Sequence, residues 1–435
     1  MKRKHLKYAL ALMVSSIPAV AWGQTARSLP GAAYAYPGDQ VYSQVAMESE
    51  TSSRIVVSDS SSSLGCTSPA GCTSPAGAGQ CADCLDHDSG CSRGIWGSAE
   101  YMFVWTKGRN QPPLVTTSTN PADEGVLGRA TTSVLFGADA IGRDLQSAGR
   151  IVVGKWLDND DSTGVAVRFL GLEGDRTNYH RSSTGTPLLA VPFFNADPLV
   201  AANDSVIAAS AQGITGSVGV KTSNDVYSVE PLLRVSLMQD ACYRVDVVGG
   251  YHHTVIDDGL TLNVISQQGA TMVHFRDLFD ARNEFHGGSF GFMGEYGTGP
   301  WTMSFLAKLS VGRTFQEVRI DGENVTDVAG NAVAATGGIF AQNTNIGTYF
   351  RHDTAYVPEL ALTANRRIND HLDLSFGYSF LYWSKVVLAG DQIDTTVDGG
   401  LLQGGNGNGI RRPVFAFRET DFYLHAMTFG LNFHY

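Results

Sequence analysis

A few residues of this chain are of types that could carry out catalysis or bind a metal. His252-His253, and His286 with Ser289, are the pairs that could supply a base or a nucleophile. Such chemistry needs a nucleophile beside a base that a third polar group orients, and neither pair belongs to a recognisable triad motif. His252 and His253 would point to opposite faces of a strand, so they cannot chelate one ion as a pair. We therefore expect no enzyme activity, no cofactor and no metal site.

The cysteines form a second reactive group. Five of the six lie between Ser58 and Ser92, in a stretch of Ser, Gly, Pro and Ala that repeats GCTSPA. Cysteines of an exported protein usually pair as disulfides, whereas Cys81-Ala-Asp-Cys84 with the nearby His87 resembles a zinc knuckle of atypical spacing. Attachment to a lipid or a partner is a third interpretation. The disulfide candidates are Cys66, Cys72, Cys81, Cys84, Cys91 and Cys242.

The N-terminus has the pattern of a secretory signal peptide. Four basic residues precede an apolar run from Ala9 to Val20, and the small-residue stretch AVAWGQ follows. The run is shorter than the roughly 20 residues that a membrane-spanning helix needs. We expect a cleaved signal over residues 1–23, a low-complexity, disordered periplasmic linker over 24–93 and a folded domain over 94–435. Cleavage removes four positive charges, so the net charge moves from −11 to −15, which argues against nucleic-acid binding.

The folded domain is predicted to consist of strands. From residue 94 onward, apolar and polar residues alternate with the period of two that is typical of a β-strand. The ten predicted strands are Ile95–Trp105, Gly149–Leu157, Thr163–Gly174, Val226–Met238, Cys242–Val255, Phe285–Gly297, Trp301–Phe315, Ala355–Arg367, Leu372–Trp383 and Phe422–Tyr435. Because only helices and closed barrels satisfy every backbone group in lipid, an exported chain without an apolar helix is either soluble or a membrane barrel.

The lengths of the connections favour the barrel. Tight turns at Asn159-Asp160, Gln239-Asp240, Thr298-Gly299 and Asn369-Asp370 alternate with long segments. We expect loops over about Thr106–Ser147, Asp175–Asp225, Ile256–Glu284, Asp321–Thr354 and Ser384–Asp421. Short turns at one end and long loops at the other are typical of an outer-membrane barrel, and an even number of strands places both termini of the barrel domain on the short-turn, periplasmic side. The predicted fold is therefore an all-β, antiparallel up-and-down transmembrane β-barrel of about ten strands.

The charges of the strands fit the same prediction. The predicted strands have one apolar face and one face of small and polar residues. Charged residues of the strands lie on the second of these faces. A charge that faces lipid near mid-membrane costs about 2–4 kcal/mol, so we expect these side chains in the lumen. The lumen-facing candidates are Glu230, Arg234, Arg244, Asp246, Lys308, Glu359 and Asp373. In the last strand the lipid face is predicted to be Phe429, Leu431, Phe433 and Tyr435, with Asn432 and His434 inward.

Three segments are similar to a known family. IWGSAEYMFVWTKGRNQPPLVTTS (Ile95–Ser118), GVLGRATTSVLFG (Gly125–Gly137) and SAGRIVVGKWLDNDDSTGVAVRFLGLEG (Ser147–Gly174) resemble the putative beta-barrel porin family of planctomycete-type bacteria. The pattern of that family is an aromatic strand, then PLVTTS, then LFG, then a hairpin with WLD at its turn. The cysteine repeats lie outside this pattern. The resemblance implies a barrel in the bacterial outer membrane.

Two functions remain open at this stage. A ten-stranded barrel lies between eight-stranded barrels filled by side chains and sixteen-stranded porins filled by water. A passive pore for small solutes is one expectation, and a filled structural or surface-interaction barrel with long external loops is the other. The expected partners are outer-membrane lipid and the barrel-assembly machinery. The loops and the N-terminal arm are candidate contacts for cell-surface or periplasmic partners.

Overall fold

The computed structural model describes residues 94–435 except 241, 406 and 408, so the expected signal peptide and linker lie outside the described residues. Ten long strands build the barrel: β1 (Ile95–Thr106), β6 (Gln146–Trp156), β7 (Thr163–Glu173), β11 (Ile214–Gln239), β12 (Tyr243–Gln268), β13 (Thr271–Thr298), β14 (Trp301–Val328), β16 (Gly347–Asn369), β17 (Leu372–Val386) and β19 (Thr420–His434). None of the helices in the described part of the chain is long and apolar enough to cross a membrane.

Shorter elements connect these strands. They are β2 (Arg109–Asn110), β3 (Val115–Ser118), η1 (Pro121–Asp123), β4 (Thr132–Phe136), β5 (Ala140–Ile141), β8 (Arg176–Ser183), β9 (Leu189–Asn195), β10 (Ala202–Ala209), β15 (Asn331–Thr336), η2 (Gly390–Gln392), β18 (Thr396–Val397) and η3 (Gly399–Gly404). The η elements are single stretches of 3₁₀ helix. β8 and β15 join the main sheet by pairing with β11 and β14.

The ten long strands pair in a ring. The order is β1, β6, β7, β11, β12, β13, β14, β16, β17, β19, and β19 pairs with β1 again. All of these pairings are antiparallel, and each strand follows its neighbour in the chain, as in an up-and-down barrel. The predicted fold class and strand number are confirmed. Closure leaves no strand edge of this ring unpaired, which a barrel in lipid requires.

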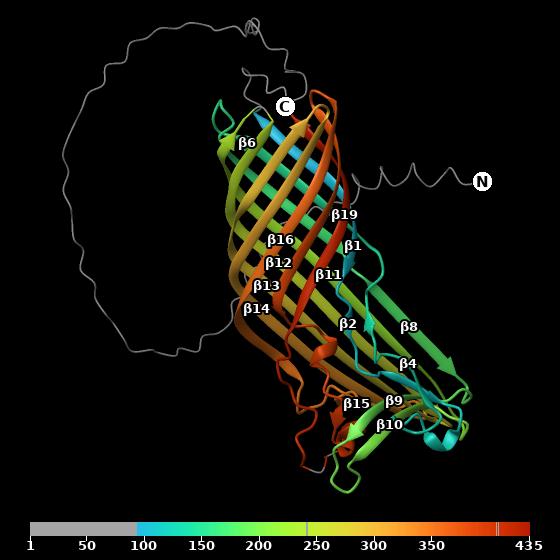
Figure 1. The fold of residues 1–435 in the computed structure, drawn as a ribbon. Coiled ribbons are helices and arrows are strands. Elements are labelled where there is room, and N and C mark those ends of the chain that lie inside the picture. The colour runs from blue at the N-terminus through green and yellow to red at the C-terminus, as the bar shows by residue number, and fades with distance from the viewer. Residues whose placement is uncertain (1–93, 241, 406, 408) are drawn as a thin grey trace, which may run out of the picture. The chain divides into compact units, whose positions relative to one another are not determined.

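The two ends of the barrel differ as the sequence predicted. The four tight turns lie at one end, where Ile95 N–H also donates to Tyr435 O at 3.1 Å. The shorter strands β8, β9, β10 and β15 gather at the opposite end, shown in the lower part of Figure 1. The start of the first strand, at Ile95, and the end of the chain, at Tyr435, therefore lie on the short-turn side.

Three of the expected long loops are wrong. Residues 256–284 are not a loop, because β12 and β13 continue as a hairpin to a turn at Gly269-Ala270. Residues 321–354 are also mostly strand, in β14, β15 and the first part of β16. So are residues 175–225, in β8, β9, β10 and the first part of β11. The physical reason is an inversion of the alternation. Leu260, Leu262 and Val264 are buried on the inner face, and polar residues such as Asp257 lie on the outer face.

This inversion marks the edge of an apolar band on the outer face. On β14 the outward residues from Trp301 to Val311 are apolar, and those beyond them include Arg313, Glu317 and Arg319. The band covers about ten residues of a strand, which is the length that a tilted strand needs to cross a bilayer. Aromatic side chains flank it at both ends, as in membrane barrels. They are Tyr243, Tyr296, Trp301 and Tyr435 at the short-turn end, and Tyr251, Tyr356, Tyr382 and Tyr423 at the other.

Beyond the band, the connecting segments fold into the barrel mouth and form a second core, which we call the external core. Its buried residues come from the inner faces of β11–β14 and from the connections. They include Leu189 and Val191 of β9, and Phe340 of the segment after β15. Burial of the apolar side chains that face inward here stabilises the fold by about 25 cal/mol per Å² of apolar surface removed from water. The extended hairpins thus carry a folded domain outside the membrane band.

Candidate functional site: the barrel lumen

Six charged side chains meet inside the barrel at the level of the apolar band. This central charge cluster consists of Glu100 (β1), Arg150 (β6), Arg168 (β7), Glu230 (β11), Lys308 (β14) and Glu359 (β16). Lys308 Nζ lies 3.0 Å from Glu359 Oε2 and also contacts Glu230. Arg150 pairs with Glu100 and donates to Ser379 Oγ at 3.3 Å. Three carboxylates and three cations balance each other, so no charge in this cluster is left buried without a partner.

One of these ion pairs spans the barrel. Arg168 Nη1 donates to Glu359 Oε2 at 2.9 Å, and both residues are buried. The strands of these two residues are not neighbours: β11, β12, β13 and β14 separate β7 from β16 on one side, and β6, β1, β19 and β17 separate them on the other. The two side chains therefore start from opposite walls. Their bond occupies the middle of the lumen.

An apolar layer lies next to the central charge cluster on the loop side. Leu170 and Val357 are the next inward residues in that direction after Arg168 and Glu359. The layer is one continuous group of buried residues to which nine of the ten barrel strands contribute, and β14 is the strand that does not. Within it the ring centroids of Phe285 and Trp383 lie 5.8 Å apart, although their strands do not pair. The indole N–H of Trp383 donates to Thr314 Oγ1 at 3.2 Å, which extends the layer to β14.

The inward face of β14 shows how completely the lumen is filled. Along this strand the inward residues Ser310, Thr314, Gln316 and Val318 all have 0% exposure. In a water-filled channel, the inward side chains would be in contact with water along the whole length of the channel. Gln316 instead uses its polar atoms within the protein, because its Nε2 donates to Lys385 O at 2.7 Å. Side chains therefore replace water over this part of the lumen.

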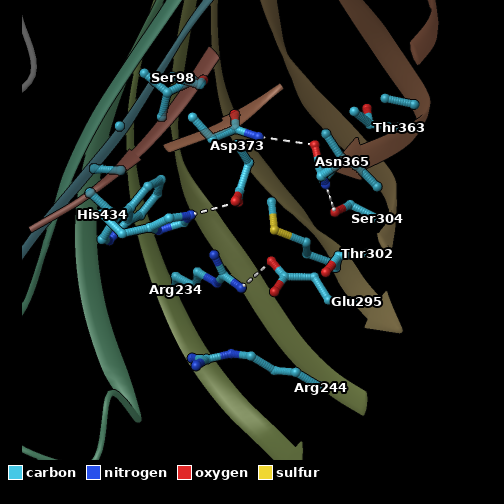
Figure 2. A pocket seen from close by; sticks show the side chains of 18 of the residues that line it. Ser98, Arg234, Arg244, Glu295, Thr302, Ser304, Thr363, Asn365, Asp373 and His434 are labelled. Carbon is cyan, nitrogen blue, oxygen red and sulfur yellow. Dashed lines mark hydrogen bonds and ion pairs between the residues drawn. The ribbon is translucent and has the colours of Figure 1, made fainter. Parts of the chain in front are cut away.

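At the short-turn end the lumen opens into a cavity of about 300 Å³, which we call the vestibule. Arg234, Glu295, Asp373 and His434 point into it, as Figure 2 shows. Arg234 Nη2 donates to Glu295 Oε1 at 2.7 Å, and His434 Nε2 lies 2.9 Å from Asp373 Oδ2. Arg244 lies with its guanidinium 4.4 Å from the ring centre of Trp156. The deep end of the vestibule is lined by members of the central charge cluster.

Buried carboxylates attach the connecting segments to the barrel wall. Asp258 of β12 accepts from Arg109 Nη1 at 2.7 Å and from the N–H of Ala389 at 2.8 Å. Asp277 of β13 accepts from the N–H groups of Ile339, Phe340 and Ala341. It lies beyond the apolar band, and its burial raises the pKa of its carboxyl to about 6, although the three amides lower it. These contacts fix the fold of the mouth.

The structure brings most of the predicted lumen residues together. Glu230, Lys308 and Glu359 belong to the central charge cluster, while Arg234, Arg244 and Asp373 line the vestibule, and Asp246 bonds with Arg234 and Arg244. The sequence analysis missed Glu100, Arg150 and Arg168 as lumen residues. The signal was present, because Arg168 has the inward position between the outward Val167 and Phe169.

The other predicted residues also have clear places. Phe429, Leu431, Phe433 and Tyr435 are exposed on the outer face, whereas Asn432 bonds inward to Asn365 at 2.9 Å. His286 faces outward and Ser289 is buried on the inner face, so these two do not form a catalytic pair. Cys242 is disulfide-bonded, and the other five cysteine candidates lie outside the described residues.

The match to a family decides the class of this barrel. Residues 96–435 match the family model described as Putative beta barrel porin-7. The chain belongs to this family. The match runs from the second residue of β1 to the end of β19, so it covers the whole ring of this porin-7 chain. The expected membership of a beta-barrel porin family is confirmed, and it indicates a barrel of the bacterial outer membrane.

Similar proteins of known structure add little to this assignment. The porin-7 chain is 8% identical to the outer membrane protease OmpT from Escherichia coli, with a TM-score of 0.37 over 79% of this chain and 97% of that one. A Pseudomonas aeruginosa FadL homologue is 6% identical, with a TM-score of 0.21 over 78% and 89%. The P. putida toluene transporter TodX is 9% identical, with a TM-score of 0.15 and the same coverage. These scores are too low to support an argument, and no curated protein matches the porin-7 chain.

Proposed function

We propose that this chain is a filled outer-membrane barrel that holds a folded domain at the cell surface. The observation that carries the proposal is the absence of exposure at four inward side chains of β14, Ser310, Thr314, Gln316 and Val318. In this proposal the lumen is a structural core. The external core, anchored by the extended hairpins of β11–β14, is the part that meets other molecules.

The energetics of the lumen support this role. Moving the central charge cluster aside would separate buried ion pairs, and breaking one such pair costs about 3–5 kcal/mol. A route for solutes would also have to pass the apolar layer, where Phe285 and Trp383 are fully buried. Both obstacles lie in series along the same axis. A passive pore with constant flow is therefore the less favoured of the two functions.

A gated pore is the second candidate, and the vestibule favours it. A cavity of about 300 Å³ at the short-turn end is large enough for a small solute, and its lining includes Glu100, Arg150 and Lys308 of the central charge cluster. The family description also contains the word porin. In this alternative a signal or a partner displaces the side chains that close the lumen.

The remaining parts of the proposal concern the cell. We propose that a cleaved signal peptide exports the chain and that the barrel-assembly machinery inserts it into the outer membrane. The outer residues of the apolar band would contact lipid, and the short turns would face the periplasm. We further propose that the protein has no enzyme activity, since the histidine and serine residues considered for catalysis lie on different faces.

A liposome-swelling assay with the full chain separates these functions. Liposomes with the wild-type protein should swell no faster in small sugars than liposomes without protein, whereas liposomes with a sixteen-stranded porin should swell quickly. A variant without residues 387–417 tests the role of the mouth, because it loses part of the external core and keeps the central charge cluster. It should also fail to support swelling. Rapid swelling with the wild type would overturn the proposal of a filled barrel.

A further inference from the structure

Two histidines from neighbouring strands face each other on the outside of the barrel. His253 of β12 and His286 of β13 are directly paired in the strand register, and their rings lie 4.7 Å apart. Directly opposite residues of an antiparallel pair place their side chains on the same face. His252 is excluded from this contact because it points inward to Ser310. The side chains of His252 and His253 thus point to opposite faces of β12, while those of His253 and His286, from two strands, lie on the same face.

A carboxylate completes the group. Glu284 lies two residues before His286 on β13 and therefore on the same face. Its Oε1 is 3.2 Å from His286 Nε2 and 3.9 Å from His253 Nε2. One potential ligand atom from each residue lies within 4.8 Å of the other two. Ligands about 2.0–2.1 Å from a tetrahedral zinc ion are about 3.3 Å from each other, so only small side-chain shifts are needed.

Neighbouring groups hold these side chains in place. The hydroxyl of Tyr251 hydrogen-bonds with His286 Nδ1, so the other ring nitrogen, Nε2, is the one that faces Glu284 and could bind the ion. Arg282 Nε lies 3.8 Å from Glu284 Oε2, on the oxygen that does not face the histidines. Partners of this kind orient the ligands of natural metal sites. His253 Nδ1, by contrast, is buried without a hydrogen bond to any described residue.

The position of the group allows an ion to reach it from outside. The exposed fractions of the side chains are 24% for His253, 28% for Glu284 and 45% for His286. Tyr251, the preceding outward residue on β12, belongs to the aromatic flank of the apolar band, and the next outward residues on the other side include Asp257. The group therefore lies at the extracellular edge of the band.

We propose that His253, Glu284 and His286 form a binding site for a divalent transition metal of the zinc type. Two imidazole nitrogens and one carboxylate oxygen match the ligand preference of Zn²⁺, and three protein ligands leave one position open to water or another ligand. The alternative is that Glu284 only forms an ion pair with His286 and Arg282. In that case the three residues would bind no metal.

The test is Zn²⁺ titration of the full chain in detergent, followed by calorimetry. Free thiols are first alkylated, so that cysteines outside the site cannot bind the ion. The wild type should bind one Zn²⁺ that is lost or weakened at least about tenfold in His286→Gln and in His253→Gln, since each removes one of three ligands. Tyr251→Phe should weaken binding by about 10-fold or more through the loss of orientation.

The matched control is His274→Gln. His274 also faces outward from β13, and its paired residues, Ile265 and Val325, cannot bind a metal. This variant should bind Zn²⁺ like the wild type. The heat-modified mobility of each variant in electrophoresis verifies that its barrel is folded. Equal Zn²⁺ binding by folded wild type, His253→Gln and His286→Gln, or no binding by the wild type, would overturn the proposal. Neither result depends on whether the lumen conducts.

Discussion

Arg168 and Glu359 form a hydrogen-bonded ion pair across the lumen, from strands that lie on opposite sides of a ten-stranded ring. Arg168 also lies 3.4 Å from Glu230, and Glu359 lies 3.0 Å from Lys308. Through these contacts the pair links β7 and β11 on one side of the lumen with β14 and β16 on the other. Backbone hydrogen bonds connect these two sides only by way of the other strands of the wall. A filled lumen of this kind makes the barrel a protein core surrounded by lipid.

Removing one charge from this pair should destabilise the barrel. In Glu359→Gln the cations Arg168 and Lys308 lose a buried partner, so the free energy of unfolding should fall by about 3–5 kcal/mol. Glu173→Gln is the control, because Glu173 is exposed on the outer face of β7. It should change the stability by less than about 0.5 kcal/mol. Urea unfolding in lipid vesicles measures both. Equal effects of the two substitutions would show that the central charge cluster contributes nothing to stability.

The cost of a charge on the last strand should depend on its depth in the apolar band. Phe429 is near the middle of the outward residues of β19, Phe433 is nearer the short-turn end, and Tyr435 is at that end. Phe429→Arg should therefore cost about 2–4 kcal/mol, Phe433→Arg less, and Tyr435→Arg about 0–1 kcal/mol. The same vesicle assay ranks the three variants. A cost that does not vary along the strand would contradict the position of the band.

The orientation of the barrel predicts which turns are accessible on cells. A peptide epitope inserted between Gly269 and Ala270 should bind an antibody on intact cells, because this turn ends the extended hairpin of β12 and β13. The same epitope between Thr298 and Gly299 should bind only after the outer membrane is permeabilised. Fluorescence of labelled cells reports both. Labelling of the second insertion on intact cells would show that the short turns face outward.

The attachment of the mouth to β13 should depend on the charge of Asp277. Its carboxylate accepts from the amides of Ile339, Phe340 and Ala341, and hydrogen bonds to a charged group contribute about 1.5–3 kcal/mol. In Asp277→Asn these amides should exchange their hydrogens about tenfold faster or more, as measured by mass spectrometry. Asp327→Asn is the control, since Asp327 accepts one hydrogen bond in an exposed turn. Unchanged exchange in Asp277→Asn would contradict the assigned contact.

The sequence was sufficient to predict the wall of the barrel. Outward apolar and inward polar residues alternate wherever a strand crosses the band, so all ten strands and four tight turns could be recognised. The extensions of β11–β14 were missed because the pattern there has the opposite phase, as on β12, where Leu260 and Leu262 are inward and Asp257 is outward. A stretch with polar residues on the outer face does not fit a strand that faces lipid, so the sequence pattern predicts a loop there. The inversion itself is the signal of the membrane edge.

The contacts inside the lumen could be predicted only in part. Alternation places Glu230, Lys308 and Glu359 on the inner face, and the ring order makes β7 and β16 opposite. Whether Arg168 and Glu359 meet depends on the tilt of the strands and on their relative register, which no local pattern encodes. The pairing of His253 with His286 likewise depends on the register of β12 and β13. Both findings needed the assembled structure.

The most direct test of the filled lumen is the electrical conductance of the wild-type barrel in a planar bilayer. The layers around Arg168, Glu359, Phe285 and Trp383 leave no inward exposure at Ser310 and Thr314. We predict that insertion of the folded chain produces no steady current above that of the protein-free bilayer. A steady current that is proportional to voltage, from wild-type protein with an intact chain, would contradict the account.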